Sequence, residues 1–144
     1  MSTKETVTGA RATLSELAAG DEMPTTVIGP ISRTDIVRYA GAGGDFNPIH
    51  HDEPLSQRFG LPQVFTMGML QGGALAQRLA RWVGPANVLS MTLRFTGQVW
   101  PGDELTLAGR VASIEDGVAT LELSAARQTG DVVIKASATA RVAH

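Results

Sequence analysis

GMLQGGALAQRLARWVGPANVLSMTLRFTGQV, residues 68–99, changes from a helical to a strand pattern at Gly84-Pro85. No proline interrupts residues 68–83, and their apolar side chains recur at spacings of three and four, which predicts a long amphipathic helix. Its apolar stripe comprises Met69, Leu70, Leu75, Leu79, Trp82 and Val83. The polar residues expected beside the stripe are Gln71, Gln77, Arg78 and Arg81. Helix propensity alone does not explain the small residues at 72–74 and 76, which are glycine and alanine. We therefore expect another element to pack closely there.

Strand patterns occupy the sequence after this helix. The expected strands cover residues 88–99, 105–114, 118–127 and 132–142, and glycine-containing turns separate the last three. One face of the first strand is expected to hold Leu89, Met91, Leu93 and Phe95. We therefore expect a long antiparallel meander whose apolar face wraps over the helix, which is an α+β architecture.

Shorter elements are expected before the long helix. Residues 25–28 are rich in β-branched side chains and lie between prolines, which predicts a short strand. Ser32 stands three residues before Asp35 in a pattern similar to a capping box, so a helix should start there and end at the glycines of 41–44. A further turn or two of helix is expected over 54–59.

Composition narrows the class of protein. The chain has 144 residues, of which 43% are hydrophobic and 18% charged, so we expect one domain over 1–144, with 1–24 as an N-terminal arm or edge segment. A net charge of -2 offers no polycationic surface, so no nucleic acid partner is expected. The absence of cysteine excludes a disulfide framework and a thiolate nucleophile. Without an apolar leader, or a window near the roughly 20 apolar residues that span a bilayer, we expect a cytoplasmic chain with no membrane partner.

The segment over residues 45–52 is the main candidate for chemistry. Its polar residues are Asp45, Asn47, His50, His51 and Asp52. Pro48 disfavours helix, so we expect an ordered loop in which the side chains of Asp45 and His50 turn toward one point and hold a water as a general acid/base pair. The alternative is structural, with Asp45 capping the next turn and His50 bonded to backbone. No third ligand accompanies the adjacent histidines, so no metal site is expected.

The start of the long helix is a second candidate position. A helix N-terminus carries free N–H groups and a positive dipole end, and Gly68 allows a substrate oxygen to approach the backbone closely. The alternative is that Gly68 only permits tight packing. Met67 and Met69 are candidates for lining an acyl pocket, although methionines at this spacing are also typical of a plain core.

Several motifs then occur in order. Asp45-Phe46-Asn47-Pro48-Ile49-His50 is followed eighteen residues after His50 by Gly68-Met69-Leu70, then by Leu93-Arg94-Phe95 and by Val99-Trp100-Pro101-Gly102-Asp103-Glu104-Leu105. In these motifs and their spacing, residues 25–142 resemble the MaoC-like family of (R)-specific enoyl-thioester hydratases and 3-hydroxyacyl dehydratases. The Asp-x-Asn-Pro-x-His element is that family's hydratase motif. The resemblance implies a hot-dog fold, in which a sheet wraps a central helix.

The resemblance also implies a reaction, the reversible syn addition of water to a trans-2-enoyl thioester to give a (3R)-3-hydroxyacyl thioester, without a metal or redox cofactor. Asp45 and His50 match the catalytic pair, and Gly68 matches the residue whose backbone N–H binds the thioester carbonyl. Asn47 matches a position that shapes the loop and orients His50. Met67 departs from the family, which usually has histidine there, and we expect the change to alter the pocket lining rather than abolish the chemistry.

The implied substrate is a thioester of coenzyme A or acyl carrier protein, in fatty-acid or steroid side-chain metabolism. Long sheet edges are usually covered, so we expect a homodimer. The alternatives are a catalytic or silent subunit of a heteromeric hot-dog dehydratase, a non-catalytic acyl-thioester binding module, and a thioesterase on the same fold.

Overall fold

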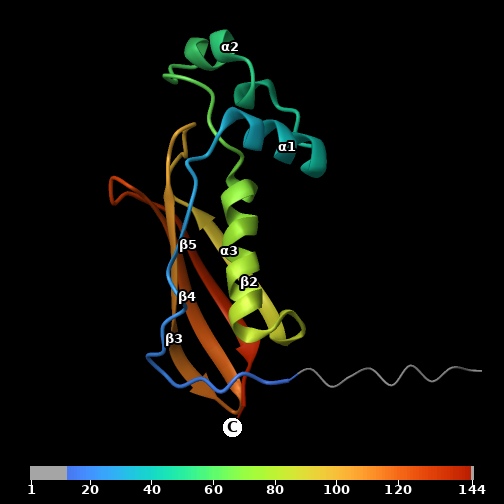
Figure 1. Ribbon diagram of the computed structural model, residues 1–144, viewed down its shortest axis with the longest axis vertical. Helices are drawn as coiled ribbons and strands as arrows, with labels where there is room; N and C mark the ends of the chain where they lie inside the picture. Colours follow the sequence, from blue (N-terminus) through green and yellow to red (C-terminus); the bar gives the residue numbers. More distant parts are fainter. Residues whose placement is uncertain (1–12, 144) are drawn as a thin grey trace, which may run out of the picture.

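A computed structural model describes residues 13–143 and shows a sheet curved around one long helix (Figure 1). Residues 1–12, half of the expected arm, and residue 144 lie outside the described residues. The strands are β1 (Thr26–Ile28), β2 (Val88–Phe95), β3 (Leu105–Glu115), β4 (Val118–Arg127) and β5 (Val132–Arg141). The helices are α1 (Arg33–Gly43), α2 (Glu53–Arg58) and α3 (Gly68–Val83), with 3-10 turns η1 (Pro48–His50) and η2 (Pro85–Asn87). The expected α+β architecture is confirmed.

The order of the strands corrects one expectation. The sheet is antiparallel in the order β1-β3-β4-β5-β2, so β2 pairs with β5 and lies at the opposite side of β4 from β3. Within residues 13–143 only β3, β4 and β5 form a meander, and the expected succession of four neighbouring strands is wrong at β2. An alternating pattern identifies the faces of a strand but does not say which strand lies beside it.

The edge position of β2 also changes what its apolar side chains do. Leu89 and Phe95, expected on the buried face, are 45% and 48% exposed, whereas Met91 and Leu93 are half-buried. A shift in register between Val88 and Ser90 takes Leu89 out of the regular alternation. The strand ends at Phe95 rather than at residue 99.

The core lies between α3 and the inner face of the sheet. Leu75, Leu79 and Val83 of α3 are completely buried, as are Leu107 of β3 and Leu121 of β4. Close packing does not require the glycines at positions 72 and 73 of α3: an added Cβ at Gly72 would lie 3.7 Å from the Leu93 side chain, an ordinary contact distance, and one at Gly73 would meet no described atom within 4 Å. Gln71, expected beside the apolar stripe, is instead 2% exposed.

The shorter helices lie beyond the N-terminal end of α3 (Figure 1). The expected capping box at the start of α1 is confirmed, since the Ser32 Oγ accepts from the Asp35 N–H and the Asp35 carboxylate accepts from the Ser32 N–H. The Ser32 hydrogen bonds hold the pKa of Asp35 below its ordinary value. Helix α1 ends at Gly43, and Gly44 caps it with a φ of 70°.

Residues 20–23 lie along β3, where the Gly20 and Met23 N–H groups donate to the Val111 and Gly109 carbonyls at 2.8 Å. The expectation of no helix around Pro48 is wrong, since Pro48 opens η1, a position where proline is tolerated because its missing N–H has no partner to lose. No helix within residues 13–143 has the length and apolar character needed to cross a membrane.

Candidate active site

Local hydrogen bonds shape the segment that carries Asp45 and His50. The Asn47 carboxamide accepts from the Ile49 N–H at 3.2 Å and thereby caps η1. Ser56 of α2, completely buried, donates to the Ile49 carbonyl at 2.8 Å and ties η1 to α2. Asp45 accepts from the Asn47 N–H at 3.3 Å, so it has the structural contact that the alternative expected.

The ring of His50 is held in one orientation. Its Nδ1 lies 2.7 Å from the carbonyl oxygen of Phe65, and the Phe65 ring packs edge-on against it at 4.9 Å between centroids. A carbonyl oxygen only accepts, so Nδ1 carries the hydrogen and Nε2 of the neutral ring is left with a free lone pair. The structural alternative predicted a contact between His50 and the backbone, and the contact with Phe65 is of that kind. The same contact leaves Nε2 able to act as a base.

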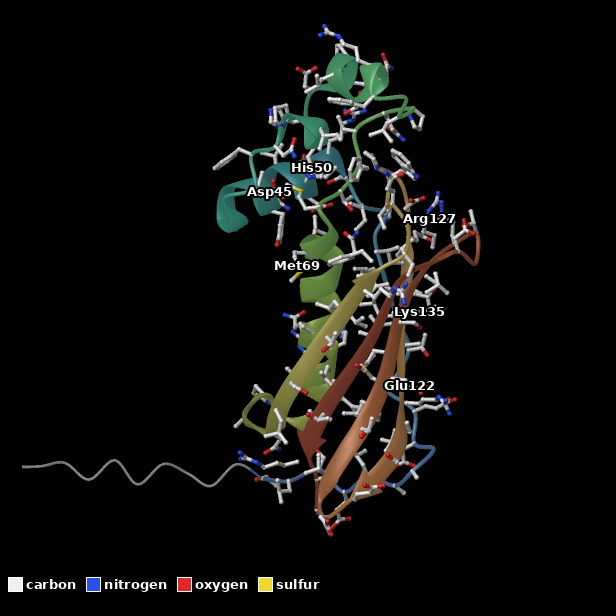
Figure 2. All side chains as sticks on the ribbon, turned by 180° about the vertical axis from the view of Figure 1, so that it is seen from behind. Asp45, His50, Met69, Glu122, Arg127 and Lys135 are labelled. Atoms are coloured by element: carbon white, nitrogen blue, oxygen red, sulfur yellow. The ribbon has the colours of Figure 1, made fainter. Side chains whose placement is uncertain are left out.

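Asp45 and His50 converge on one space. The His50 Nε2 lies 3.8 Å from the Asp45 Oδ2, and Figure 2 shows the two side chains together near the end of α3. This separation is too long for a direct hydrogen bond and leaves both atoms able to bind the same water. The ring of His50 is almost buried and the Asp45 carboxylate is partly exposed, so a water between them is reachable from solvent.

A cavity of about 340 Å³ opens where Asp45 and His50 meet the first turn of α3. Met67, Gly68 and Met69 line it with them. Met67 gives α3 no side-chain cap, and the Gly68 N–H finds no hydrogen-bond acceptor in residues 13–143. A free N–H at the positive end of a 16-residue helix is suited to bind a carbonyl oxygen on which negative charge develops.

The structure thus brings together most of the candidates that the sequence identified. Asn47 does not line the cavity but caps the loop, and its carbonyl accepts from the His50 N–H at 3.1 Å. Thr66, next to Met67, lines the cavity as well, and sequence reasoning missed Phe65, Gln71, Phe95, Gly97 and Gln98 as lining residues. The only available signal was Gln71, a polar residue among apolar neighbours in α3.

An ion pair between buried Asp103 and partly buried Arg127 supports the segment that carries Gly97 and Gln98 into the cavity. Asp103 accepts from Arg127 Nε at 2.7 Å, from the Gln128 amide at 2.8 Å and from the Trp100 N–H at 2.8 Å. Burial raises the pKa of Asp103, but the hydrogen bonds from these groups outweigh burial and hold the pKa below its ordinary value. The hydrogen bond to Asp103 raises the pKa of Arg127.

No group of three or more His, Asp or Glu side chains in residues 13–143 is arranged to hold a metal ion. The donors in the cavity are nitrogen and oxygen atoms placed for hydrogen bonding and proton transfer. Groups arranged in this way are able to carry out general acid/base chemistry beside a helix N-terminus.

A sheet wrapped around a long helix, with this site at the N-terminus of the helix, defines a class of protein domain. The chain belongs to that class, because residues 15–132 match the MaoC like domain family. Among curated proteins, the "3-oxo-4,17-pregnadiene-20-carboxyl-CoA hydratase beta subunit" of Mycobacterium tuberculosis is 29% identical over 101 residues, which are 69% of this chain and 78% of that one. The expected class of enzyme, a hydro-lyase, has general support from the hydratases and dehydratases among its relatives.

Solved structures confirm the hot-dog fold. The R-hydratase PhaJ1 from Pseudomonas aeruginosa superposes with a TM-score of 0.77 at 26% identity, over 88% of this chain and 84% of that one. The ChsH1-ChsH2 complex from Mycobacterium tuberculosis contains a chain with a TM-score of 0.78 at 24% identity, over 88% of this chain and 98% of that one.

Proposed function

We propose that this chain catalyses the reversible syn addition of water to a trans-2-enoyl thioester, giving a (3R)-3-hydroxyacyl thioester. The observation that carries the proposal is the 3.8 Å separation of the His50 Nε2 and the Asp45 Oδ2 at the mouth of a cavity that also reaches the Gly68 N–H. Family membership and the likeness to an R-hydratase support the same reaction.

In the proposed mechanism, one water bridges the two side chains. His50 Nε2 takes a proton from the water while the Asp45 carboxylate accepts its other hydrogen, and the water oxygen forms a bond to C3. The electron pair of the double bond moves toward the thioester carbonyl, whose oxygen the Gly68 N–H stabilises. The proton held on His50 then passes to C2 on the same face, so all atoms of the water end in the product. Dehydration reverses these steps.

The proposed substrate class is an acyl-CoA or acyl-carrier-protein thioester of fatty-acid or steroid side-chain metabolism. A hydratase relative that acts on a carboxyl-CoA and a mitochondrial 3-hydroxyacyl-[acyl-carrier-protein] dehydratase from Solanum lycopersicum support both carriers. The cavity walls formed by Met67 and Met69 are apolar and adaptable, as an acyl chain requires.

We also propose that the chain works as a homodimer paired along β2. This strand is a sheet edge, and its exposed Leu89 and Phe95 leave apolar surface uncovered in the single chain. A different hot-dog chain as the partner remains the second candidate, which the naming of one relative as a beta subunit favours. Size measurement of the purified chain distinguishes the two.

The function is tested with the purified chain and crotonyl-CoA, by the loss of enoyl absorbance and by chiral analysis of the product. We expect His50→Gln and Asp45→Asn to lower kcat by about 10²–10⁴-fold, because each removes a proton-transfer partner. His51→Gln is the matched control, since His51 is exposed in the same segment, and it should retain the wild-type rate.

Other outcomes point to the alternatives. Release of free thiol without a hydroxyacyl product would identify a thioesterase. Binding of butyryl-CoA, without turnover of any enoyl thioester by the chain or by its complex with a second hot-dog chain, would identify a binding module. Equal rates in wild type and His50→Gln would exclude the proposed mechanism.

A further inference from the structure

Gln71 is a buried polar side chain that the proposed mechanism does not use. It lies in the first turn of α3, is 2% exposed, and lines the cavity with Asp45, His50 and Gly68. A glutamine amide has one acceptor and two donor hydrogens, and burying such a group is unfavourable unless these are satisfied.

One side of the Gln71 amide is fixed. Its Oε1 accepts a hydrogen bond of 2.8 Å from the hydroxyl of Thr66, which is equally buried. Thr66 is itself held by its N–H, which donates to the Val99 carbonyl at 2.9 Å. The reverse orientation of the amide would leave the Thr66 hydroxyl hydrogen with no acceptor in residues 13–143. The amide oxygen therefore points to Thr66 and the nitrogen points away.

The other side of the amide has no partner among the residues that the structure describes. Gln71 Nε2 finds no hydrogen-bond acceptor within residues 13–143. All fully buried side-chain nitrogen and oxygen atoms in these residues have a hydrogen-bond partner. The nitrogen therefore keeps its small residual exposure, and the space that Gln71 lines is the candidate active-site cavity. A donor without a protein partner that borders a cavity is satisfied by whatever occupies that cavity.

The position of Gln71 on the helix directs this donor. Gln71 follows Gly68 by three residues, so the two lie on one face of α3, and helical side chains tilt toward the N-terminus. The Gln71 side chain accordingly reaches back toward the end of the helix where the free Gly68 N–H points. One backbone donor and one side-chain donor thus belong to residues that line the same cavity at the same end of α3.

We propose that the Gln71 amide donates a second hydrogen bond, beside that of the Gly68 N–H, to the carbonyl oxygen of the bound thioester. This inference rests on the proposed function. A carbonyl oxygen has two lone pairs and accepts both bonds, and each strengthens as negative charge collects on the oxygen during addition at C3. Gln71 is then a catalytic residue that contacts substrate, and its loss should lower kcat more than it raises KM.

The first test compares Gln71→Met and Gln71→Glu with wild type. Methionine keeps the volume of the side chain but has no hydrogen-bond donor. We therefore expect kcat to fall by about 10²-fold, and this factor should be the same at every pH. The carboxyl group introduced by Gln71→Glu still accepts from Thr66, but it donates to substrate only when protonated. The ratio of its kcat to that of wild type should therefore rise as pH falls through the titration of that carboxyl. A purely structural amide predicts no such pH-dependent ratio.

Gln77→Met is the matched control, because it makes the same chemical change on the exposed side of α3 and should leave kcat unchanged. This test assumes that the wild-type chain is active and that its activity depends on His50. If the kcat values of Gln71→Glu and Gln71→Met then equal the wild-type kcat at all pH values, the role of Gln71 is overturned and the proposed function stands. Should Gln71→Met fail to fold, Gln71→Glu decides alone, since it keeps both the shape and the Thr66 contact.

A spectroscopic test separates this inference from the proposed function. Butyryl-CoA labelled with ¹³C at the thioester carbonyl does not react, and its bound infrared band moves to lower frequency with each hydrogen bond to the oxygen. We expect the band of the Gln71→Met complex to shift back toward that of free butyryl-CoA, while Gln77→Met keeps the wild-type band. An unchanged band in Gln71→Met contradicts the contact even where the wild-type chain proves not to be a hydratase.

Discussion

The ring of Phe95, at the end of β2, lies against the backbone of Gly68, the first residue of α3, so closely that a Cβ added at Gly68 would be 2.9 Å from the Phe95 Cε1. Both residues line the candidate active-site cavity. The absence of a side chain at Gly68 therefore lets the Phe95 ring pack closely and also leaves the backbone N–H open to the cavity. The sequence left two roles open for Gly68, tight packing and close approach of a substrate oxygen, and these roles do not exclude one another.

We expect Gly68→Ala to lower kcat/KM by about 10-fold or more, because the Phe95 ring must move into the cavity or the helix end must retreat from substrate. The double variant Gly68→Ala with Phe95→Leu should recover much of this loss, since the smaller side chain leaves room for the methyl group. Steady-state kinetics and thermal unfolding of the three proteins check the prediction. Full activity of Gly68→Ala alone would show that the contact does not constrain the site.

The cap that Asn47 provides should matter for activity more than for folding. Asn47→Ala removes the acceptor for the Ile49 N–H, with an expected loss of about 1 kcal/mol in the free energy of unfolding and a lower kcat because η1 carries His50. Asn47→Asp keeps an acceptor and should restore most of both. Urea unfolding measured beside crotonyl-CoA turnover tests the pair, and equal kcat values for Asn47→Ala and wild type would argue against a positioning role.

The buried Asp103 predicts a specific pH dependence of stability. Its folded-state pKa is below that of the unfolded chain, so the stabilisation is present above pH 4 and is lost as pH falls through the folded pKa. Asp103→Asn should reduce the free energy of unfolding by about 2 kcal/mol at pH 7 and by progressively less toward pH 3. Denaturant titrations at several pH values measure this difference.

Asp131 offers the matched control for Asp103. It also faces Arg127, at 3.4 Å, but it is exposed, so Asp131→Asn should change stability by less than about 0.5 kcal/mol at any pH. A destabilisation by Asp103→Asn that stays the same from pH 7 to pH 3 would mean that the carboxylate charge is not what stabilises this part of the fold.

The proposed pairing along β2 predicts an asymmetry between the two edges of the sheet. Leu89→Lys puts a charge on the β2 edge and should shift the wild-type dimer toward monomer, because the charge would be buried without a partner. Val27→Lys makes an equivalent change on exposed Val27 of β1 and should leave the mass unchanged. Sedimentation velocity distinguishes these results. A dimer broken only by Val27→Lys would place the interface on the other edge.

A wild-type chain that is monomeric by itself contradicts the homodimer. If that monomer gains hydratase activity when a different hot-dog chain is added, the heteromeric alternative holds. The activity assay on the mixture, repeated with His50→Gln in this chain, then shows which of the two subunits supplies the catalytic pair.

Local patterns in the sequence determined the elements of this protein. The three- and four-residue spacing of apolar side chains, closed by Gly84-Pro85, specified α3 with the ends that the structure has, and the Ser32 and Asp35 pair specified the start of α1. The Asp-x-Asn-Pro-x-His element likewise indicated Asp45 and His50, which the structure places 3.8 Å apart. Such features depend on neighbours a few residues apart, which a sequence displays directly.

Only the tertiary structure decided which elements lie side by side. The alternation in β2 did not reveal that its partner is β5, and the polar character of Gln71 did not reveal that it is buried beside Thr66. The approach of Phe95 to Gly68 joins residues 27 positions apart. Periodicity states which way a side chain faces within its own element, whereas burial and contact depend on how distant segments pack, and that is determined by the whole chain at once.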